Sequence, residues 1–448
     1  MAATIVGPGS PGWSLRVAFA HYSQADDISG VTTWVLGLAR RLAADGVSVA
    51  IHFLIAPGAG SSEGSAEGRG EPPLFQALRR QGIEVFATPR RASLEADARD
   101  TLAFLNHWRP TVFLPQCKPA HYAAAAQAGR RGLPWALTLH SDDPDYWATV
   151  AAFGGARQGS ELVCVSRHIR EACAARGIDR PARVIPYGVQ VPATATDVRA
   201  DPFRVVFSGR IWEHQKRALL VIRTLIQACR SKASIRATLI GDGYARGDCE
   251  RQVAEAGLAA AIDFTGSLPP EQVKARLLDA QAILLMSDFE GLPIALLEAM
   301  AAGVVPVVRR IPSGIPELVD DGRTGLLVSE DPEEAAAALG RLADDPALWR
   351  RCSTAARELV SGLYNADASY LLWRRLLEEL DQQGRAAPSS PYPIPCRRIG
   401  GLRGIPPSFH QEYRAPQPRS AALRQALRTA VARAKHRIKG VLGRRRGG

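Results

Sequence analysis

The fold of this 448-residue chain is decided by the stretch Ser287-Asp288-Phe289-Glu290-Gly291-Leu292-Pro293-Ile294-Ala295-Leu296-Leu297-Glu298-Ala299-Met300. The apolar run just before it, residues 282–286, predicts a buried strand. A helix is predicted to begin near Pro293, because proline suits the first position of a helix. In a doubly wound α/β sheet, a strand followed by a tight loop and a helix N-terminus binds a nucleotide or a phosphate. The sequence therefore predicts an α/β fold with a ligand at this loop.

Two carboxylates of this stretch, Glu290 and Glu298, lie eight positions apart, the first in the predicted loop and the second inside the predicted helix. Taken alone, the pair favours an ordinary helix start whose acidic residues are stabilised by the helix macrodipole. A functional interpretation depends on what the rest of the chain brings to the same edge of the sheet.

Length and composition indicate a globular protein of two or three domains, since 448 residues exceed one ordinary domain and 46% are hydrophobic. The seven cysteines are scattered and none forms Cys-x-x-Cys, which predicts a reducing compartment without a disulfide framework or a cysteine-type zinc site. Residues 1–13 lack the pattern of a signal peptide, and no apolar run approaches the roughly 20 residues that span a bilayer. We therefore expect a cytoplasmic protein.

The positive charge of the chain belongs to its C-terminal tail. Residues 384–448 contain fifteen Lys and Arg and one acidic residue, whereas residues 1–383 contain 41 basic and 43 acidic residues. This separation argues against nucleic-acid binding by the body of the protein, although the net charge is +12.

The N-terminal half begins with a strand–loop–helix–strand pattern over residues 15–20, 21–30, 31–44 and 47–55. It is half of a nucleotide-binding unit, but it lacks the Gly-x-Gly-x-x-Gly fingerprint of dinucleotide sites. Gly30 at the predicted helix start allows a ligand to approach the backbone closely, and an ordinary helix cap explains it equally well.

Further strands are predicted at residues 83–86, 111–114, 135–139 and 162–165, with helices between them, and a strand plus a turn at 183–189, so the sheet is expected to be parallel. His140 follows the strand at 135–139 and precedes an acidic loop. This is the sheet edge where the architecture places ligands, although a lone histidine is more often structural.

A Pro/Ala/Thr/Asp connector at residues 191–202 separates this half from a second α/β series. We predict strands at 203–207, 236–240, 262–266, 282–286, 303–308 and 325–328. The predicted organisation is an N-terminal acceptor-binding domain at 1–190, a linker at 191–202, a nucleotide-sugar-binding domain at 203–364, C-terminal helices at 365–383 that pack back on the N-terminal domain, and a Pro/Arg-rich linker with a basic helix at 384–448.

Several motifs of the second series occur in a specific order. They are Gly209-Arg210 with Lys216 six residues on, Gly241-Asp242-Gly243, Phe264-Thr265-Gly266, Glu290-x₇-Glu298 leading into Ala299-Met300-Ala301-Ala302-Gly303, and Pro316-Glu317-Leu318-Val319 leading into Gly325-Leu326-Leu327-Val328. With these motifs, residues 15–383 resemble the retaining nucleotide-sugar glycosyltransferases of family 4, whose GT-B fold has two doubly wound Rossmann-like domains facing a central cleft. The N-terminal half matches more loosely, through Ser29-Gly30-Val31 and Thr138-Leu139-His140.

The resemblance implies a role for each matching residue. Catalytic roles fall to His140, Glu290, Arg210 and Lys216. Donor-binding roles fall to Gly30, Gly209, Arg210, Lys216, Gly266, Glu290, Gly291, Leu292, Ile294 and Glu298. In this scheme the two cations and the helix N-terminus hold the diphosphate, Glu290 holds sugar hydroxyls and Glu298 holds the ribose diol.

The chemistry is consistent with this assignment, because fixed cations and a helix N-terminus can stabilise a leaving diphosphate without a metal. We therefore expect no metal and no cofactor besides the nucleotide-diphosphate sugar donor. By resemblance the reaction retains the anomeric configuration without a protein nucleophile. Asp142 and Tyr146 are candidates for binding the acceptor, a glycan or a lipid-linked sugar, and an ordinary exposed loop explains them as well.

Two other function classes are open at this stage. One is a catalytically silent sugar-nucleotide-binding protein on the same fold, against which the joint presence of Arg210, Lys216, Glu290 and Glu298 argues. The other is polyanion binding by the tail, whose residues 420–443 have apolar side chains at helical spacing with Lys and Arg largely on the other face. A basic amphipathic helix also fits an anionic membrane surface, so the protein is expected in the cytoplasm or peripheral at the inner face of the membrane.

Overall fold

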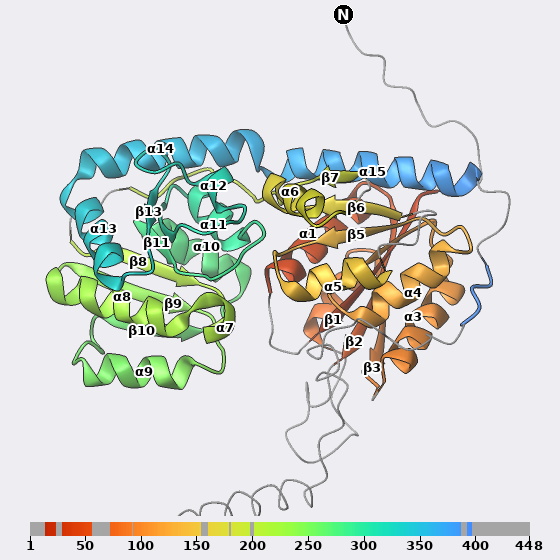
Figure 1. Ribbon diagram of the computed structural model, residues 1–448, viewed down its shortest axis with the longest axis horizontal. Coiled ribbons are helices and arrows are strands. Elements are labelled where there is room, and N and C mark those ends of the chain that lie inside the picture. Colours follow the sequence, from red (N-terminus) through yellow and green to blue (C-terminus); the bar gives the residue numbers. More distant parts are fainter. Residues whose placement is uncertain are drawn as a thin grey trace, which may run out of the picture.

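The computed structural model describes residues 14–23, 29–55, 72–91, 93–153, 160–178, 181–197, 201–386 and 392–396. The basic helix predicted at 420–443 lies outside these residues, as does most of the linker before it. Within the described residues two parallel sheets are covered by helices and lie side by side (Figure 1).

The first sheet has seven strands in the order β3-β2-β1-β4-β5-β6-β7. Its strands are β1 (Arg16–Ser23), β2 (Ser48–Ile55), β3 (Ile83–Pro89), β4 (Val112–Pro115), β5 (Trp135–Leu139), β6 (Ser160–Cys164) and β7 (Ala182–Val184). Its helices are α1 (Gly30–Ala44), α2 (Pro73–Arg80), α3 (Leu94–Trp108), α4 (Pro119–Gly129), α5 (Pro144–Phe153) and α6 (Arg167–Ala175). The strand order reverses between β1 and β4, where a doubly wound sheet opens a crevice.

The second sheet has six strands in the order β10-β9-β8-β11-β12-β13. Its strands are β8 (Phe203–Ser208), β9 (Ile235–Ile240), β10 (Ile262–Gly266), β11 (Ala282–Leu285), β12 (Val305–Arg309) and β13 (Leu326–Val328). The helices that follow in the chain are α7 (Glu213–Lys216), α8 (Ala218–Ser231), α9 (Arg246–Glu255), α10 (Pro270–Asp279), α11 (Ile294–Ala301), α12 (Ile315–Leu318), α13 (Pro332–Asp344), α14 (Pro346–Leu363) and α15 (Ala366–Ala386). Its strand order reverses between β8 and β11.

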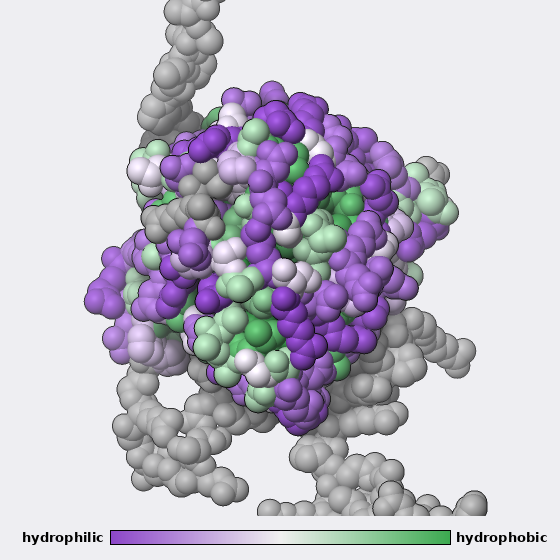
Figure 2. Space-filling view, turned by 90° about the vertical axis from the view of Figure 1, so that its left-hand side faces the viewer, coloured by the Kyte–Doolittle hydropathy of each residue, from purple (hydrophilic) through white to green (hydrophobic). Residues whose placement is uncertain are grey.

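The central strands are buried on both faces, which explains why they read as unbroken apolar runs rather than as alternating ones. Every residue of β4, β5 and β11 is buried. The outer end of the second domain, by contrast, is mostly hydrophilic with scattered apolar residues (Figure 2).

The two-sheet α/β architecture predicted from the sequence is confirmed. Most predicted strands are present with shifts of one or two residues at their ends. Between β8 and α8 the chain forms the short helix α7, which the sequence analysis did not predict. Pro293 precedes α11 as an extended residue with φ −69° and ψ 115°, so the helix begins one residue later than its sequence suggests.

The chain passes between the two domains twice, at adjacent points. Val189, on the way to the second sheet, pairs with Asn365, on the way back. Helix α15 then lies along the first domain, where Tyr370 donates a hydrogen bond to Asp45 at 2.5 Å and Arg41 pairs with Asp367 at 2.8 Å (Figure 1). None of the helices in the described part of the chain is long and apolar enough to span a bilayer.

Candidate active site

The candidate site lies where the strand order of the second sheet reverses. Strand β11 pairs in parallel with β8, with Ala282 opposite Val205, so the loops that follow these strands leave the sheet side by side. The loop after β8 carries Gly209 and Arg210, and the loop after β11 carries Glu290. The sheet topology therefore brings together the two groups of residues that the motifs selected.

A third loop, which follows β9 and carries Gly241, packs against the loop after β8. A Cβ atom added to Gly241 would lie 2.0 Å from the carbonyl oxygen of Gly209, so no side chain fits there. The absence of a side chain lets the loop after β9 pack directly against the loop after β8.

Lys216 and Glu290 form a nearly buried ion pair. Their Nζ and Oε1 atoms are 2.6 Å apart, and only 13% of the lysine and 7% of the glutamate side chain is exposed. Breaking this buried ion pair would be costly, because either charge alone would then be buried without a partner. The contact joins the helix after β8 to the loop after β11.

Arg210 is oriented by two neighbours that the sequence did not single out. Its guanidinium carbon lies 4.3 Å from the ring centre of Trp212, and its Nη2 donates to Gln215 Oε1 at 2.9 Å. Gln215 also donates through Nε2 to the carbonyl of Phe289 at 3.1 Å. Gln215 therefore connects Arg210 to the loop of Glu290.

A cavity of about 890 Å³ opens between the two domains at these loops. Five of the predicted donor-binding residues line it: Gly30, Gly209, Arg210, Ile294 and Glu298. The other five, Lys216, Gly266, Glu290, Gly291 and Leu292, are not among the described residues that line it. Glu290 and Leu292 are buried, with exposed fractions of 5% and 2%.

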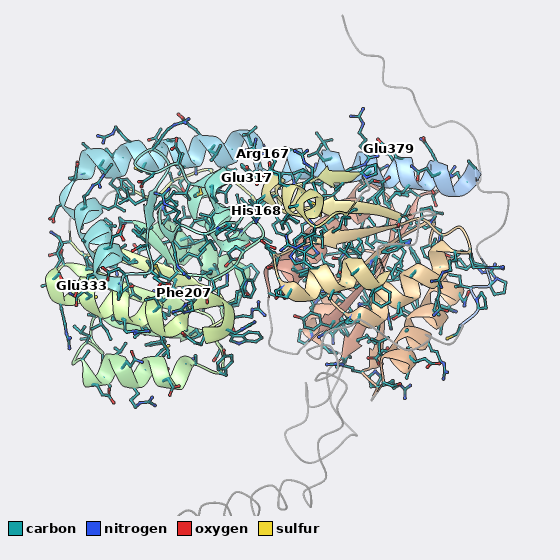
Figure 3. The ribbon with its side chains drawn as sticks, viewed as in Figure 1. Arg167, His168, Phe207, Glu317, Glu333 and Glu379 are labelled. Atoms are coloured by element: carbon teal, nitrogen blue, oxygen red, sulfur yellow. The ribbon has the colours of Figure 1, made fainter. Side chains whose placement is uncertain are left out.

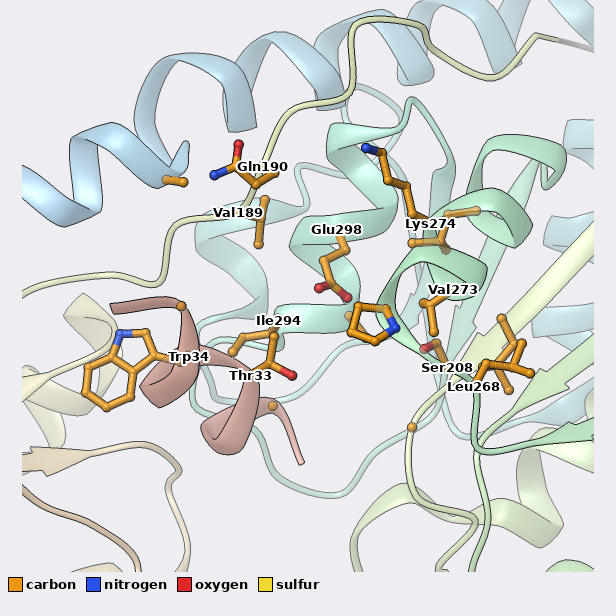
Figure 4. Close-up of a pocket in the computed structure, with 18 of the residues that line it drawn as sticks. Thr33, Trp34, Val189, Gln190, Ser208, Leu268, Val273, Lys274, Ile294 and Glu298 are labelled. Carbon is orange, nitrogen blue, oxygen red and sulfur yellow. The ribbon is translucent and has the colours of Figure 1, made fainter. Parts of the chain in front are cut away.

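Glu298 points into the middle of this cavity (Figure 4). No described residue forms a hydrogen bond or an ion pair with its carboxylate. Burial raises the pKa of this carboxylate from 4.5 to about 7. Since an unpartnered buried acid is costly, its position indicates a ligand that donates hydrogen bonds to it.

The N-terminus of α11 faces the same cavity, through Ile294 and Ala295. The first backbone N–H groups of a helix have no partner inside the helix, and the macrodipole adds positive potential there. The cavity is therefore suited to an anionic group between Arg210 and Glu298.

One face of α1, together with α15, forms the opposite wall of the cavity. The sequence analysis predicted only Gly30, the first residue of α1, as a site residue in this wall. A Cβ atom added to Gly30 would lie 3.4 Å from Ile294 Cδ1, so the two domains nearly touch there. The other lining residues of these helices are Thr33, Trp34, Gly37, Leu38, Arg41, Ala366, Ser369, Tyr370 and Trp373. The helical spacing of Gly30, Thr33, Gly37 and Arg41 is visible in the sequence, but nothing there shows that this face looks into a cavity.

His140 is enclosed rather than open to the cavity. It is 5% exposed, and its ring nitrogens lie 2.5 Å from Tyr187 Oη and 2.6 Å from Gln116 Oε1. Because the Gln116 oxygen can only accept, Nε2 donates to it and Nδ1 accepts from the tyrosine. Burial, and to a smaller extent the neighbouring His21, lowers the pKa of His140 to about 3, so the imidazole is neutral.

The two candidate acceptor residues are held by neighbouring side chains. Asp142 accepts from Trp147 Nε1 at 2.6 Å and pairs with His168 Nε2 at 3.0 Å. The Tyr146 hydroxyl lies 3.6 Å from Cys117 Sγ. Both residues lie at the carboxyl edge of the first sheet, and neither is among the residues that line the cavity. In the described residues we find no group of three His, Cys, Asp or Glu side chains placed to hold a metal ion.

Comparison with known proteins gives two family matches. Residues 28–191 match the family model described as Glycosyltransferase Family 4, and residues 202–345 match the one described as Glycosyl transferases group 1. Together the two matches cover more than half of the chain, one on each domain.

Curated relatives match over part of the chain. The putative colanic acid biosynthesis glycosyltransferase WcaL of Salmonella typhimurium is 38% identical over 181 residues, which is 37% of this chain and 43% of that protein. The amylovoran biosynthesis glycosyltransferase AmsK of Erwinia amylovora is 34% identical over 195 residues, 41% of this chain and 46% of that protein. The matched segment thus spans less than half the length of either relative.

Among solved structures, Anabaena Alr3699/HepE in complex with UDP and glucose superposes with a TM-score of 0.66 at 16% identity, covering 81% of this chain and 99% of that one. This likeness establishes the GT-B fold. With both domains matched by family models and the motif residues gathered at one edge of the second sheet, the chain belongs to the family 4 glycosyltransferases.

Proposed function

We propose that this protein transfers a sugar from a nucleotide-diphosphate sugar to an acceptor hydroxyl, with retention of anomeric configuration and without a metal. The observation that carries the proposal is the unpartnered Glu298 carboxylate in the same cavity as Arg210 and the N-terminus of α11. A nucleoside diphosphate can interact with all of these groups. Its ribose diol donates hydrogen bonds to the Glu298 carboxylate, and its anionic phosphates pair with Arg210 and the helix N-terminus.

In the proposed reaction the bond between the sugar C1 and the phosphate oxygen breaks, and negative charge develops on the diphosphate. Arg210, Lys216 and the N–H groups at Ile294 stabilise that charge. Glu298 accepts from the ribose hydroxyls, and the loop from Glu290 to Leu292 holds hydroxyls of the sugar. The acceptor oxygen forms its bond to C1 on the face that the diphosphate leaves, and its proton passes to the leaving phosphate oxygen, so no side chain acts as nucleophile. The neutral His140 contributes shape and hydrogen bonds rather than charge.

For the acceptor we propose a glycan or a lipid-linked sugar used in polysaccharide assembly. This rests on the similarity to WcaL and AmsK, which are glycosyltransferases of colanic acid and amylovoran biosynthesis. It would be bound by the first domain, at the carboxyl edge that carries His140 and Asp142.

A donor panel tests the proposal. The full chain is mixed with UDP-, GDP- and ADP-sugars, its melting temperature is measured, and release of nucleoside diphosphate is followed. One donor is expected to raise the melting temperature and to be cleaved slowly, because a ligand that binds only the folded state stabilises it. Cleavage should persist in EDTA, and proton NMR should show the original anomeric configuration in the product. Binding without cleavage of any donor would favour the silent binding protein, and no binding at all would contradict both functions.

The Glu298→Gln change is expected to stabilise the free protein at pH 8 while weakening donor binding. The folded-state pKa of about 7 exceeds the ordinary 4.5, so this group's contribution to stability is lost as the pH rises through that range. Removing the charge should therefore raise the free energy of unfolding at pH 8 by up to about 3 kcal/mol. The amide accepts fewer hydrogen bonds, so the melting shift produced by the nucleoside diphosphate should shrink.

The matched control is Glu271→Gln, an exposed glutamate that lines the same cavity. It should leave the melting temperature of the free protein unchanged at pH 8. A Glu298→Gln protein that melts no higher than wild type would contradict the burial cost assigned to this carboxylate.

We also propose that the basic tail holds the enzyme at an anionic membrane surface on the cytoplasmic side, close to a lipid-linked acceptor. Co-sedimentation with liposomes containing anionic lipid should pellet the full chain but not a chain that ends at Gln383. Equal pelleting of the full chain and the shortened chain would contradict this part of the proposal.

A further inference from the structure

Helix α6 of the first domain is capped by a residue of the second domain. The backbone N–H of His168 donates to Glu317 Oε1 at 2.9 Å, and Arg167 Nε lies 3.3 Å from Glu317 Oε2. Figure 3 shows these three residues where the domains meet. Only 12% of the glutamate side chain is exposed.

The contact uses a general property of helix starts. Ser166 caps α6 from within its own domain by accepting from Ile169 N at 3.2 Å, which leaves the N–H of His168 for another acceptor. Glu317 supplies that acceptor together with a negative charge, which the N-terminal end of the macrodipole favours. Across the interface the carboxylate therefore finds a hydrogen bond, a guanidinium and a helix end.

On its own side, Glu317 belongs to a segment fixed to the loop after β11. Gly314 N donates to the carbonyl of Gly291 at 2.9 Å, and a Cβ atom added to Gly314 would lie 2.2 Å from that oxygen. The segment of Glu317 and the loop that carries Glu290 are thus in direct contact.

On the other side, α6 is fixed to the loop after β5. His168 Nε2 contacts Asp142 Oδ2 at 3.0 Å, and Asp142 Oδ1 accepts from Trp147 in α5. In addition, a Cβ atom added to Gly291 would lie 2.1 Å from the carbonyl oxygen of His140. The loop after β11 is therefore in direct backbone contact with the loop after β5.

We propose that Glu317 is a positioning residue that holds these two loops in contact. It sets the distance between the group bound at Glu290–Leu292 and the group bound at the edge of the first domain. Its consequence for catalysis rests on the proposed function, in which these are the donor sugar and the acceptor, whereas the contact itself does not. Asp142, placed among the acceptor candidates by sequence, acts here as the partner of His168.

Hydrogen exchange of the full-length protein tests the contact without any ligand. In Glu317→Ala, amide exchange should speed up on the order of ten-fold in peptides covering residues 166–170 and 288–293, since the first loses an acceptor and the second loses its support. Glu317→Gln keeps an acceptor for His168 N and should show a smaller change. The control is Asp320→Asn, which breaks an exposed pair with Arg323 next to α12 and should leave both peptides unchanged.

Activity supplies the second readout, with the nucleotide sugar that the wild type cleaves best in the donor panel. Glu317→Ala should lower kcat on the order of ten-fold at an unchanged donor KM, and Glu317→Gln should recover part of the loss. Unchanged exchange at 288–293 in Glu317→Ala would overturn the inference, as would a loss of activity that appears only in KM. If the wild type cleaves no donor, the proposed function fails, and hydrogen exchange still decides the role of Glu317.

Discussion

Replacing Lys216 with methionine is expected to lower the free energy of unfolding by about 3 kcal/mol and to reduce sugar transfer by a factor on the order of 10²–10³. The first effect arises because Glu290, 7% exposed, loses the ammonium 2.6 Å away and keeps its charge without a partner. The second follows from the proposed reaction, in which Lys216 is one of the cations that stabilise the leaving diphosphate. Urea denaturation and release of nucleoside diphosphate measure the two effects separately.

The double variant Lys216→Met/Glu290→Gln distinguishes stability from catalysis. With both charges gone, no uncompensated charge is left in the interior, and most of the lost stability should return. The catalytic activity should not return, because in the proposed reaction the diphosphate still lacks the Lys216 cation and the sugar hydroxyls contact an amide.

A surface pair on the same domain provides the control. Lys232 pairs with Asp344, which is 66% exposed, and Lys232→Met should cost less than about 1 kcal/mol and leave turnover unchanged. Full recovery of activity in the double variant would show that Lys216 only neutralises Glu290 and does not bind the donor.

Mild acid is expected to destabilise the protein, mainly through the histidines of its first domain. Its interior contains four histidines, His21, His52, His121 and His140, each at most 5% exposed. Burial is the main cause that lowers the pKa of His21 and His140 to about 3, that of His52 to about 4, and that of His121 well below 6.5. The folded protein therefore keeps all four neutral at pH values at which the unfolded chain protonates them.

Proton linkage gives the direction in which the free energy of unfolding changes with pH. A lowered folded-state pKa gives stability that is present above 6.5 and is lost as the pH falls toward the folded value. From pH 7.5 to pH 5.5 the loss is about 1.4 kcal/mol per histidine, or roughly 5 kcal/mol for four. The raised pKa of Glu298 acts in the opposite direction and offsets about 2 kcal/mol. A net loss of about 3–4 kcal/mol should appear in urea denaturation at the two pH values.

Single variants identify the source of this pH dependence. His52→Gln should reduce the loss between pH 7.5 and 5.5 by about 1.4 kcal/mol, whatever its effect at pH 7.5. His107→Gln, at an exposed position of the same domain, should leave the pH dependence as it is. An unchanged pH dependence in His52→Gln would show that this histidine does not enter the linkage.

Local patterns were sufficient to predict the architecture and four residues of the second domain that line the cavity, namely Gly209, Arg210, Ile294 and Glu298. Parallel strands in the centre of a sheet are covered on both faces and therefore carry an unbroken apolar sequence. An apolar run such as residues 282–286 is thus sufficient to predict a central strand. Glu298 was found because its distance from Glu290 is set within one strand–loop–helix unit. Such features are encoded over ten or fifteen residues, a range that sequence analysis covers well.

Features that depend on contacts between distant segments were not predictable. Gln215 orients Arg210 only because α7 lies against the loop after β11, and Glu317 caps α6 only because the two domains meet there. His140 was recognised as a residue of the sheet edge. Its neutral, enclosed state depends on Tyr187 and Gln116, which are 47 and 24 positions away. Burial and partners of this kind come from tertiary packing and leave no local pattern.

The pairing of Val189 with Asn365 has a consequence for how this protein can be re-engineered. Because the chain leaves the first domain and returns to it at neighbouring backbone positions, residues 190–364 have the geometry of an insertion between two adjacent ends. A corresponding segment from another enzyme of this fold could be exchanged there with only two junctions. Under the proposed function, such a chimera would keep the domain that binds the acceptor and import the domain that binds the donor, so an exchange at these two junctions would give new donor–acceptor combinations.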